Sequence, residues 1–112
     1  MGEMKAIHRD FNRFMATMAK NYPDVAKAFG GLFTVAERDG ALDNKTKELI
    51  SLALAVAAHC DGCIAVHVAK CLEVGSTHDE IMESAFVAVL MGGGPAMVYT
   101  KLVYDALQEY SE

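Results

Sequence analysis

The sequence lacks the features of an exported or membrane-bound chain. Residues 1–14 carry charges throughout and contain no apolar segment of the kind found in signal peptides. Residues 84–100 form the longest uncharged stretch, which is shorter than the roughly 20 residues that span a bilayer and is interrupted by Gly-Gly-Gly-Pro. Basic residues are also few, with 10 Lys and Arg against 15 Asp and Glu, which disfavours nucleic acid and anionic membranes as partners. We therefore expect a cytoplasmic protein with neither nucleic-acid nor membrane partners.

Strand patterns are absent as well, because no segment alternates apolar and polar residues in the way of a half-buried strand. Apolar residues instead recur at three- and four-residue spacing, which is typical of amphipathic helices. Gly, Pro and capping residues divide this pattern into helices at about residues 4–18, 23–40, 45–59, 60–74, 77–91 and 95–110. With no linker or internal repeat in a chain of ordinary domain length, we predict a single all-α domain, residues 1–112, of about six helices.

Local signals place several of the helix starts. Pro23 suits the first position of the second helix, where the missing N–H has no helical partner. Asp43 or Asn44 can cap the third helix, and Thr77 with Glu80 has the sequence of a capping box before the fifth. The Gly-Gly-Gly-Pro sequence is then expected to separate the last two helices.

The apolar fraction is high for a lone small domain, at 53% with seven methionines. We therefore expect part of the apolar surface to lie against another subunit in a homo-oligomer. The stripes at residues 4–18 and 96–107 are predicted to lie at or near the subunit contacts.

Cysteines are few, but their arrangement is the most informative feature of the chain. Four potential metal or redox ligands share one stripe of the predicted helix at 60–74: Cys60, Cys63, His67 and Cys71. A single straight helix cannot wrap all four around one metal, because its first and last members are about 16 Å apart along the axis. A zinc site would need a fourth ligand from elsewhere, such as His59 or His78, and no second pair of ligands is present. Zinc is therefore the less favoured interpretation.

Two interpretations remain for the cysteines themselves: buried hydrophobic side chains or a redox-active pair. They could be small buried hydrophobes, which we favour for Cys71. The pair Cys60 and Cys63 encloses Asp-Gly, which suits an exposed helix start, where free N–H groups and the helix dipole favour a thiolate. Side chains three apart on a helix also lie about 5–6 Å apart at Cβ, close enough to join as a disulfide after modest rotation.

A reactive thiol also needs a base. His67 lies one turn beyond Cys63 on the same stripe, where the alternative is a satisfied core histidine. Glu48 stands among apolar residues of the third helix and could supply a carboxylate. An equally weighted alternative is that Glu48 is a solvated residue of the first helical turn, where it complements the helix dipole.

The spacing E-x11-C-x2-C-x3-H, formed by Glu48, Cys60, Cys63 and His67, resembles the core of the AhpD-like alkylhydroperoxidases. The surrounding residues 40–95 resemble the small carboxymuconolactone decarboxylase-type members of that superfamily. The resemblance implies an AhpD-like helical bundle that reduces alkyl hydroperoxides or hydrogen peroxide with its CxxC pair. It implies that Cys63 attacks the peroxide, that Cys60 is the more accessible partner and resolves the sulfenic acid, and that Glu48 and His67 relay protons.

The same resemblance implies the partners. They are a small-molecule hydroperoxide and a dithiol reductant, such as a lipoyl protein, with no metal or haem cofactor. It also implies assembly as a trimer or hexamer. In one place the sequence departs from the family pattern, because Gly62 stands where a second histidine precedes the second cysteine; the available substitute is His59.

Two other functions compete with peroxide reduction. Carboxymuconolactone decarboxylases of the same superfamily use the histidine position without a CxxC pair, which would leave Cys60 and Cys63 unexplained. A non-enzymatic thiol redox sensor would use the same pair but would not turn over.

Overall fold

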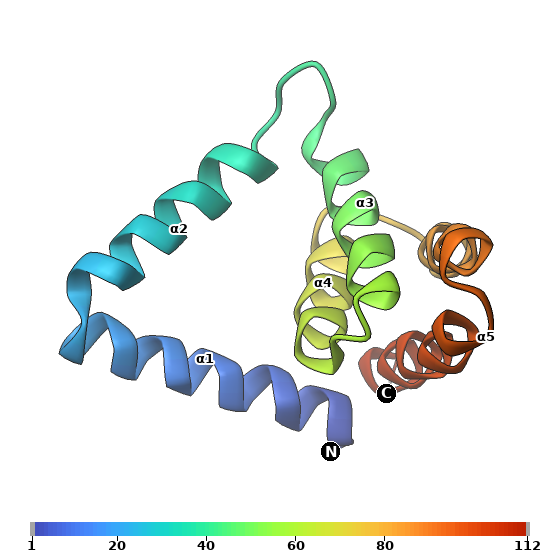
Figure 1. The fold of residues 1–112 in the computed structure, drawn as a ribbon, viewed down its shortest axis with the longest axis horizontal. Coiled ribbons are helices and arrows are strands. Elements are labelled where there is room, and N and C mark those ends of the chain that lie inside the picture. The colour runs from blue at the N-terminus through green and yellow to red at the C-terminus, as the bar shows by residue number, and fades with distance from the viewer. Residues whose placement is uncertain (1, 112) are drawn as a thin grey trace.

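The computed structural model describes residues 2–111, which form helices joined by short connections. In chain order these are α1 (Glu3–Asn21), α2 (Pro23–Glu37), α3 (Asn44–Ala57), α4 (Asp61–Glu73) and α5 (His78–Tyr110) (Figure 1). No strand occurs within residues 2–111, so the predicted all-α fold is confirmed. Residues 1 and 112, the two ends of the predicted domain, lie outside the described residues.

The helix count differs from the prediction because the last two predicted helices are joined as α5. The chain changes direction at Gly93, whose φ of 65° and ψ of −151° are not helical (Figure 1). Glycine adopts this positive φ without the steric penalty of a side chain, and Pro95 lacks the N–H that a continuous helix would use. The predicted break is therefore present as a kink at Gly93 between two helical halves of α5.

The predicted helix starts are confirmed. Asp43 accepts a hydrogen bond from the N–H of Thr46 at 2.8 Å and caps α3. Thr77 and Glu80 form both hydrogen bonds of a capping box before α5. Pro23 occupies the start of α2.

The core lies between α3, α4 and α5. Its fully buried side chains come almost entirely from these three helices: Leu52, Val56, Ile64, Val68, Cys71, Ile81, Val103 and Leu107. By length and composition alone, α5 is also long and apolar enough to cross a membrane. Core helices of globular proteins meet the same criterion, and the buried face of α5 packs into this core.

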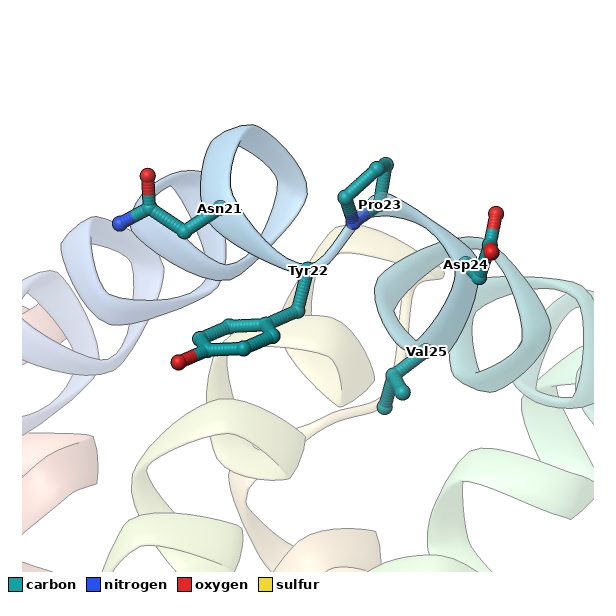
Figure 2. Close-up of a pocket in the computed structure, with 5 residues that line it drawn as sticks. All are labelled: Asn21, Tyr22, Pro23, Asp24 and Val25. Atoms are coloured by element: carbon teal, nitrogen blue, oxygen red, sulfur yellow. The ribbon is translucent and has the colours of Figure 1, made fainter.

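The first two helices form an arm beside the core (Figure 1). The start of α1 is attached to the core, because Met4 is buried and Glu109 accepts hydrogen bonds from the N–H groups of Met4 and Lys5 at 3.1 and 2.8 Å. The chain turns at Tyr22, where Tyr22 and Val25 point to one side of the corner (Figure 2). None of the described residues of α2 is buried.

The two stripes expected at or near subunit contacts are each partly buried and partly exposed in the single chain. Parts of both predicted stripes are used inside the single chain, because Met4, Ala96 and Leu107 belong to its core. Large exposed apolar side chains lie on the arm, in α3 and near the kink of α5, and four of them, Phe11, Phe14, Met97 and Val98, belong to the predicted stripes. The others are Tyr22, Val25, Phe29, Leu32, Val35, Ile50, Leu54, Phe86, Val87, Leu90 and Met91.

Candidate active site

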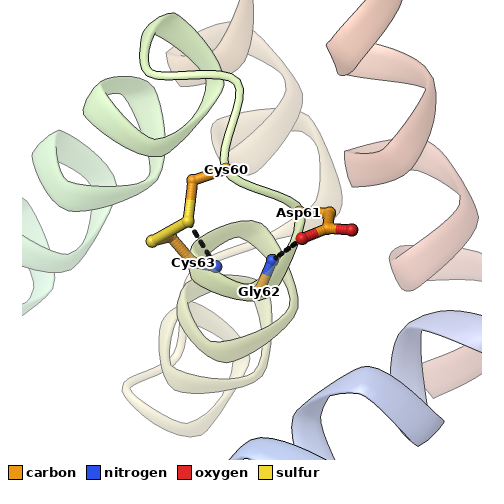
Figure 3. The surroundings of a disulfide bond; sticks show 4 residues. All are labelled: Cys60, Asp61, Gly62 and Cys63. Atoms are coloured by element: carbon orange, nitrogen blue, oxygen red, sulfur yellow. Dashed lines mark hydrogen bonds between the residues drawn. A yellow bond between two sulfur atoms is a disulfide. The ribbon is translucent and has the colours of Figure 1, made fainter.

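A disulfide bond joins Cys60 and Cys63 at the start of α4 (Figure 3). Cys60 is the N-cap residue, and its Sγ accepts a hydrogen bond from the N–H of Cys63 at 3.1 Å. The Asp61 carboxylate accepts a hydrogen bond from the N–H of Gly62 at 2.6 Å. Both sulfur atoms therefore lie at the positive end of the α4 dipole, where a thiolate is favoured once the disulfide is reduced.

The two cysteines are not equally exposed. Cys63 is exposed in the first turn of α4, whereas Cys60 is half-buried. Cys60 is held in the connection from α3, because its N–H donates to the carbonyl of Ala55 at 3.1 Å. The expectation that Cys60 is the more accessible cysteine is therefore wrong for the disulfide form of the single chain.

His59 was the expected substitute for the second family histidine. It has a φ of 55°, which is rare for a residue with a side chain. Its ring stacks on Tyr99 of α5, with centroids 4.8 Å apart and planes 11° from parallel. The structure thus places His59 against α5, and it shows no hydrogen bond from His59 to either cysteine among the described residues.

Glu48 and His67 meet between α3 and α4. Glu48 is only 3% exposed, so the interpretation as a solvated first-turn residue is wrong. Its Oε1 lies 2.7 Å from Nδ1 of His67. The His67 ring also stacks on the ring of Phe33 of α2, and the two ring centroids are 5.8 Å apart. Because Nδ1 is engaged and the ring is held in place, Nε2 is the nitrogen that remains for proton transfer.

A second carboxyl group, which sequence reasoning missed, belongs to Glu37 at the end of α2. Its Oε1 accepts a hydrogen bond from the hydroxyl of Ser51 at 2.5 Å, and its carbonyl accepts one from the Asn44 side chain at 2.7 Å. The other carboxyl oxygen, Oε2, is buried without a hydrogen-bond donor among the described residues. In the sequence Glu37 stands in a charged turn, Glu-Arg-Asp-Gly, which is typical of a solvated helix end. No spacing rule connects it to Glu48.

The two carboxyl groups have pKa values shifted in opposite directions. Burial raises the pKa of Glu37, and the hydrogen bond and negative charge of Glu48 add to this, although the Ser51 hydrogen bond acts against it. Burial would also raise the pKa of Glu48, but hydrogen bonds with His67 and Glu37 and the charges of His67 and Lys70 outweigh it. The pKa of Glu48 is therefore held below its ordinary value.

A mainly apolar pocket of about 260 Å³ opens beside the disulfide. Its lining joins α1, α2 and the start of α4: Phe11, Phe29, Phe33, Cys60, Asp61, Gly62, Cys63, Val66 and His67. The structure therefore brings Cys60, Cys63 and His67 to one pocket, with Glu48 buried behind His67.

Cys71 is separate from this site. It is a free thiol with no exposed surface, which confirms its interpretation as a buried hydrophobe. Burial, with the nearby charges of Glu48 and Glu37, raises its pKa to about 12. Within residues 2–111, no three His, Cys, Asp or Glu side chains are grouped so that they could hold a metal ion.

Comparisons with known proteins agree with this geometry. Residues 23–106 match the Carboxymuconolactone decarboxylase family. An uncharacterised protein of Cupriavidus necator is 32% identical over 94% of this chain and 96% of its own length. A protein from the cox locus of Paracoccus denitrificans, also uncharacterised, is 39% identical over 73% of this chain and 74% of its own.

Two solved structures share the fold closely. A carboxymuconolactone decarboxylase family protein from Legionella pneumophila superposes with a TM-score of 0.93 at 39% identity, over 97% of both chains. A family member from Thermotoga maritima, for which an involvement in the antioxidative response has been suggested, gives a TM-score of 0.83 at 28% identity, over 93% of this chain and 89% of its own. The chain, with its CxxC pair, belongs to the carboxymuconolactone decarboxylase family, as its sequence predicted.

Proposed function

We propose that the protein is a thiol-dependent peroxidase whose Cys60–Cys63 pair cycles between dithiol and disulfide. One observation carries this proposal. The disulfide shares a pocket with His67, and a buried carboxylate, Glu48, binds the far nitrogen of that histidine. The suggested antioxidative involvement of the relative from Thermotoga maritima supports it.

In the first step the thiolate of Cys63 attacks the terminal oxygen of a hydroperoxide, ROOH. The O–O bond breaks, the sulfur becomes a sulfenic acid, and the alkoxide RO⁻ leaves. His67 donates a proton from Nε2 to form the alcohol ROH, while Glu48 stabilises the imidazolium through Nδ1. We assign the attack to Cys63 because it is the more exposed cysteine and lies one turn from His67.

In the second step the sulfur of Cys60 attacks the sulfenic sulfur of Cys63. The S–O bond breaks and the S–S bond forms. The thiol proton of Cys60 leaves through His67 and joins the departing hydroxide to give water. The sum is two thiols and one hydroperoxide converted to one disulfide, one alcohol and one water, and an external dithiol then reduces the disulfide.

The pocket indicates the substrate class. Its aromatic and aliphatic lining favours an organic hydroperoxide over hydrogen peroxide, because an alkyl group would displace water from apolar surface. A carboxylated lactone, the substrate of the decarboxylase alternative, would instead meet the Asp61 carboxylate, with His67 as the one basic side chain in the lining. The decarboxylase function is therefore the less favoured.

The proposal also includes the reductant, the cellular location and the oligomeric state. The reductant is a dithiol, such as a lipoyl protein, in the cytoplasm. The exposed apolar side chains of the arm and of α5 favour a homo-oligomer, for which we propose a trimer or hexamer.

Thiol titration and turnover test the proposed function. The reduced protein is treated with one equivalent of an organic hydroperoxide, and its free thiols are counted before and after. A peroxidase or a sensor loses two thiols, whereas a decarboxylase need not lose any. Sustained hydroperoxide consumption with a dithiol then separates the peroxidase from the sensor.

Cysteine variants assign the two steps. Cys60→Ser is expected to consume one equivalent of hydroperoxide and stop at the sulfenic acid, and Cys63→Ser to consume almost none. The reverse result would exchange the two roles. Equal reaction of both variants and wild type would contradict the proposed function.

A further inference from the structure

The carboxyl groups of Glu37 and Glu48 shift each other's pKa, although they come from different helices, and they would repel each other if both were ionised. The hydrogen bond from Ser51 satisfies Oε1 of Glu37, but Oε2 is buried and no donor reaches it among the described residues. A carboxylate oxygen buried in this way is unfavourable, since a buried polar atom without a partner costs about 1–3 kcal/mol. A proton placed on that oxygen would turn an unpaired acceptor into a donor for Glu48.

We propose that Glu37 is a neutral positioning residue. It holds a proton on Oε2, and this O–H group donates a hydrogen bond to the Glu48 carboxylate. Glu48 then receives a hydrogen bond on each side, from Glu37 and from His67. This part of the inference stands on the buried, unpartnered oxygen of Glu37, and the opposite pKa shifts of the two carboxyl groups support it. Its effect on catalysis rests on the peroxidase function proposed above.

The charges around the pair agree with one shared proton. The titratable groups that act on it are His67 and Lys70 of α4, both positive or able to become so, and the neutral thiol of Cys71. They stabilise one negative charge close to His67, at Glu48. The pKa of Glu37 is raised and that of Glu48 is lowered, as expected if the proton resides on Glu37.

In the relay, a protonated Glu37 would affect both the charge of Glu48 and the orientation of its carboxylate. A neutral donor at Glu37 keeps Glu48 ionised and directs its other oxygen to Nδ1 of His67. When Glu37 ionises at higher pH, two negative charges face each other, Glu48 loses a donor, and the Glu48–His67 hydrogen bond is perturbed. Peroxide reduction should therefore decline as pH rises through the pKa of Glu37.

Two substitutions distinguish a neutral hydrogen-bond donor at position 37 from a negative charge that the reaction requires there. Glu37→Gln can accept from Ser51 and donate an N–H to Glu48, but it cannot ionise. Glu37→Leu has a similar size and offers no donor. We expect Glu37→Gln to reduce an organic hydroperoxide about tenfold or more faster than Glu37→Leu, the rate equivalent of one hydrogen bond to a charged group. The alkaline decline due to Glu37 should be missing in Glu37→Gln.

If Glu37→Gln is as slow as Glu37→Leu although both are folded, an ionised carboxylate is required and the inference is overturned. Glu83→Gln, on an exposed position of α5, is the matched control for loss of a carboxylate.

A measurement without turnover tests the proton directly. The side-chain carboxyl carbons of the disulfide form are titrated by carbon-13 NMR, with Glu37→Gln and Glu48→Gln used for assignment. Glu37 is expected to titrate above the ordinary glutamate pKa and Glu48 below it. A Glu37 that titrates at or below the ordinary value would overturn the inference even in an active peroxidase. Absent turnover with the expected titration would instead remove the peroxidase proposal and leave the acid–carboxylate pair in place.

The pH dependence of the free energy of unfolding tests the raised pKa of Glu37 in a second way, because the direction of the change is fixed. Because the folded-state pKa of Glu37 is above the unfolded value, the folded chain keeps a proton that the unfolded chain has released. The free energy of unfolding of the wild type should therefore fall, relative to Glu37→Gln, as pH rises from the ordinary glutamate pKa through the folded pKa. A difference that does not change with pH would contradict a raised pKa.

Discussion

Helix α2 of the arm differs from the core helices α3, α4 and α5 in burial far more than in composition. On average α2 is the most apolar of the helices, yet none of its described residues is buried in the single chain. The core helices bury Leu52, Ile64, Val103 and others completely. Helical periodicity therefore identifies an apolar face, but it does not identify whether the single chain buries that face.

The same contrast divides the candidate site. The core supplies both cysteines, His67 and Glu48, within 20 residues of sequence. The arm supplies Phe33, which stacks on His67, and Glu37, which approaches Glu48. The cysteines that we propose to react belong to the core, whereas the aromatic wall of the pocket and Glu37 belong to the arm.

Apart from the cysteines themselves, the largest effect on activity is expected from the core residues of the relay. Glu48→Gln and His67→Gln should each slow hydroperoxide reduction more than about thirtyfold. Ionisation of a thiol with an ordinary pKa accounts for at most about 2 kcal/mol at neutral pH, or about thirtyfold in rate. Proton delivery to the alkoxide adds to this, because general acid catalysis typically contributes about 10²–10⁴-fold. Single-turnover rates across a pH series measure both parts.

Higher pH should recover only the part due to ionisation in these variants. Glu83→Gln on the exposed face of α5 is the control and should retain the wild-type rate. A Glu48→Gln variant that turns over like wild type would contradict the role of Glu48 in the relay.

This division explains what the sequence could predict. Cys60, Cys63 and His67 could be grouped from the sequence because they follow helical intervals along one helix, whereas Glu48 of α3 was grouped with them only through the family resemblance. The helix starts were predictable because Asp43, Thr77 and Glu80 act on backbone groups within four residues. These hydrogen bonds join residues that are close in the chain, so a single sequence is enough to predict them.

The remaining features depend on tertiary geometry. Glu37 reaches Glu48 because the α2–α3 connection folds back, and a charged helix end gives no sign of that. The joining of two predicted helices at Gly93 depends on how both halves pack on α3 and α4. The relative exposure of Cys60 and Cys63 depends on the connection from α3, which residue types do not reveal.

The next effect is on stability and compares the same substitution in the two regions. Leu52→Ala in the core should lower the free energy of unfolding by about 2–5 kcal/mol, because it removes a fully buried side chain and leaves a cavity. Leu32→Ala in the arm should change it by less than about 0.5 kcal/mol in dilute protein, since Leu32 is 67% exposed. Urea unfolding at low protein concentration measures both.

Protein concentration sharpens this comparison. If a second copy covers the arm, the effect of Leu32→Ala should increase with protein concentration while that of Leu52→Ala stays constant. Light scattering at micromolar concentration should show an oligomer in the wild type. A monodisperse monomer, with a concentration-independent effect of Leu32→Ala, would contradict the proposed assembly.

A smaller effect on activity is expected from the arm side of the pocket. Phe33→Leu removes the ring that stacks on His67 but keeps an apolar side chain. The rate should fall about two- to tenfold, because an aromatic contact contributes roughly 0.5–1.5 kcal/mol beyond its buried area. Phe14→Leu, on an exposed position of α1, is the control. A loss as large as that of His67→Gln would show that the arm takes part in the reaction itself.

The smallest effect on activity is expected at Cys71, although it lies in the core and on the same helix as the reacting pair. It is about 12 Å along the helix axis from Cys63, beyond the reach of a disulfide. Its pKa of about 12 leaves essentially no thiolate at neutral pH. Cys71→Ala should therefore keep the dithiol-dependent rate within about twofold of wild type while lowering the stability by about 1 kcal/mol.

Cys71→Ser should also retain most activity, with a larger loss of stability, because it places a hydroxyl where no polar partner is expected. If Cys71→Ala were as inactive as Cys63→Ser at a temperature where it stays folded, the pairing of Cys60 with Cys63 would be wrong. Position in the core therefore does not make a cysteine reactive. The pair that we propose to react has both the helix start and the pocket formed with the arm, and Cys71 has neither.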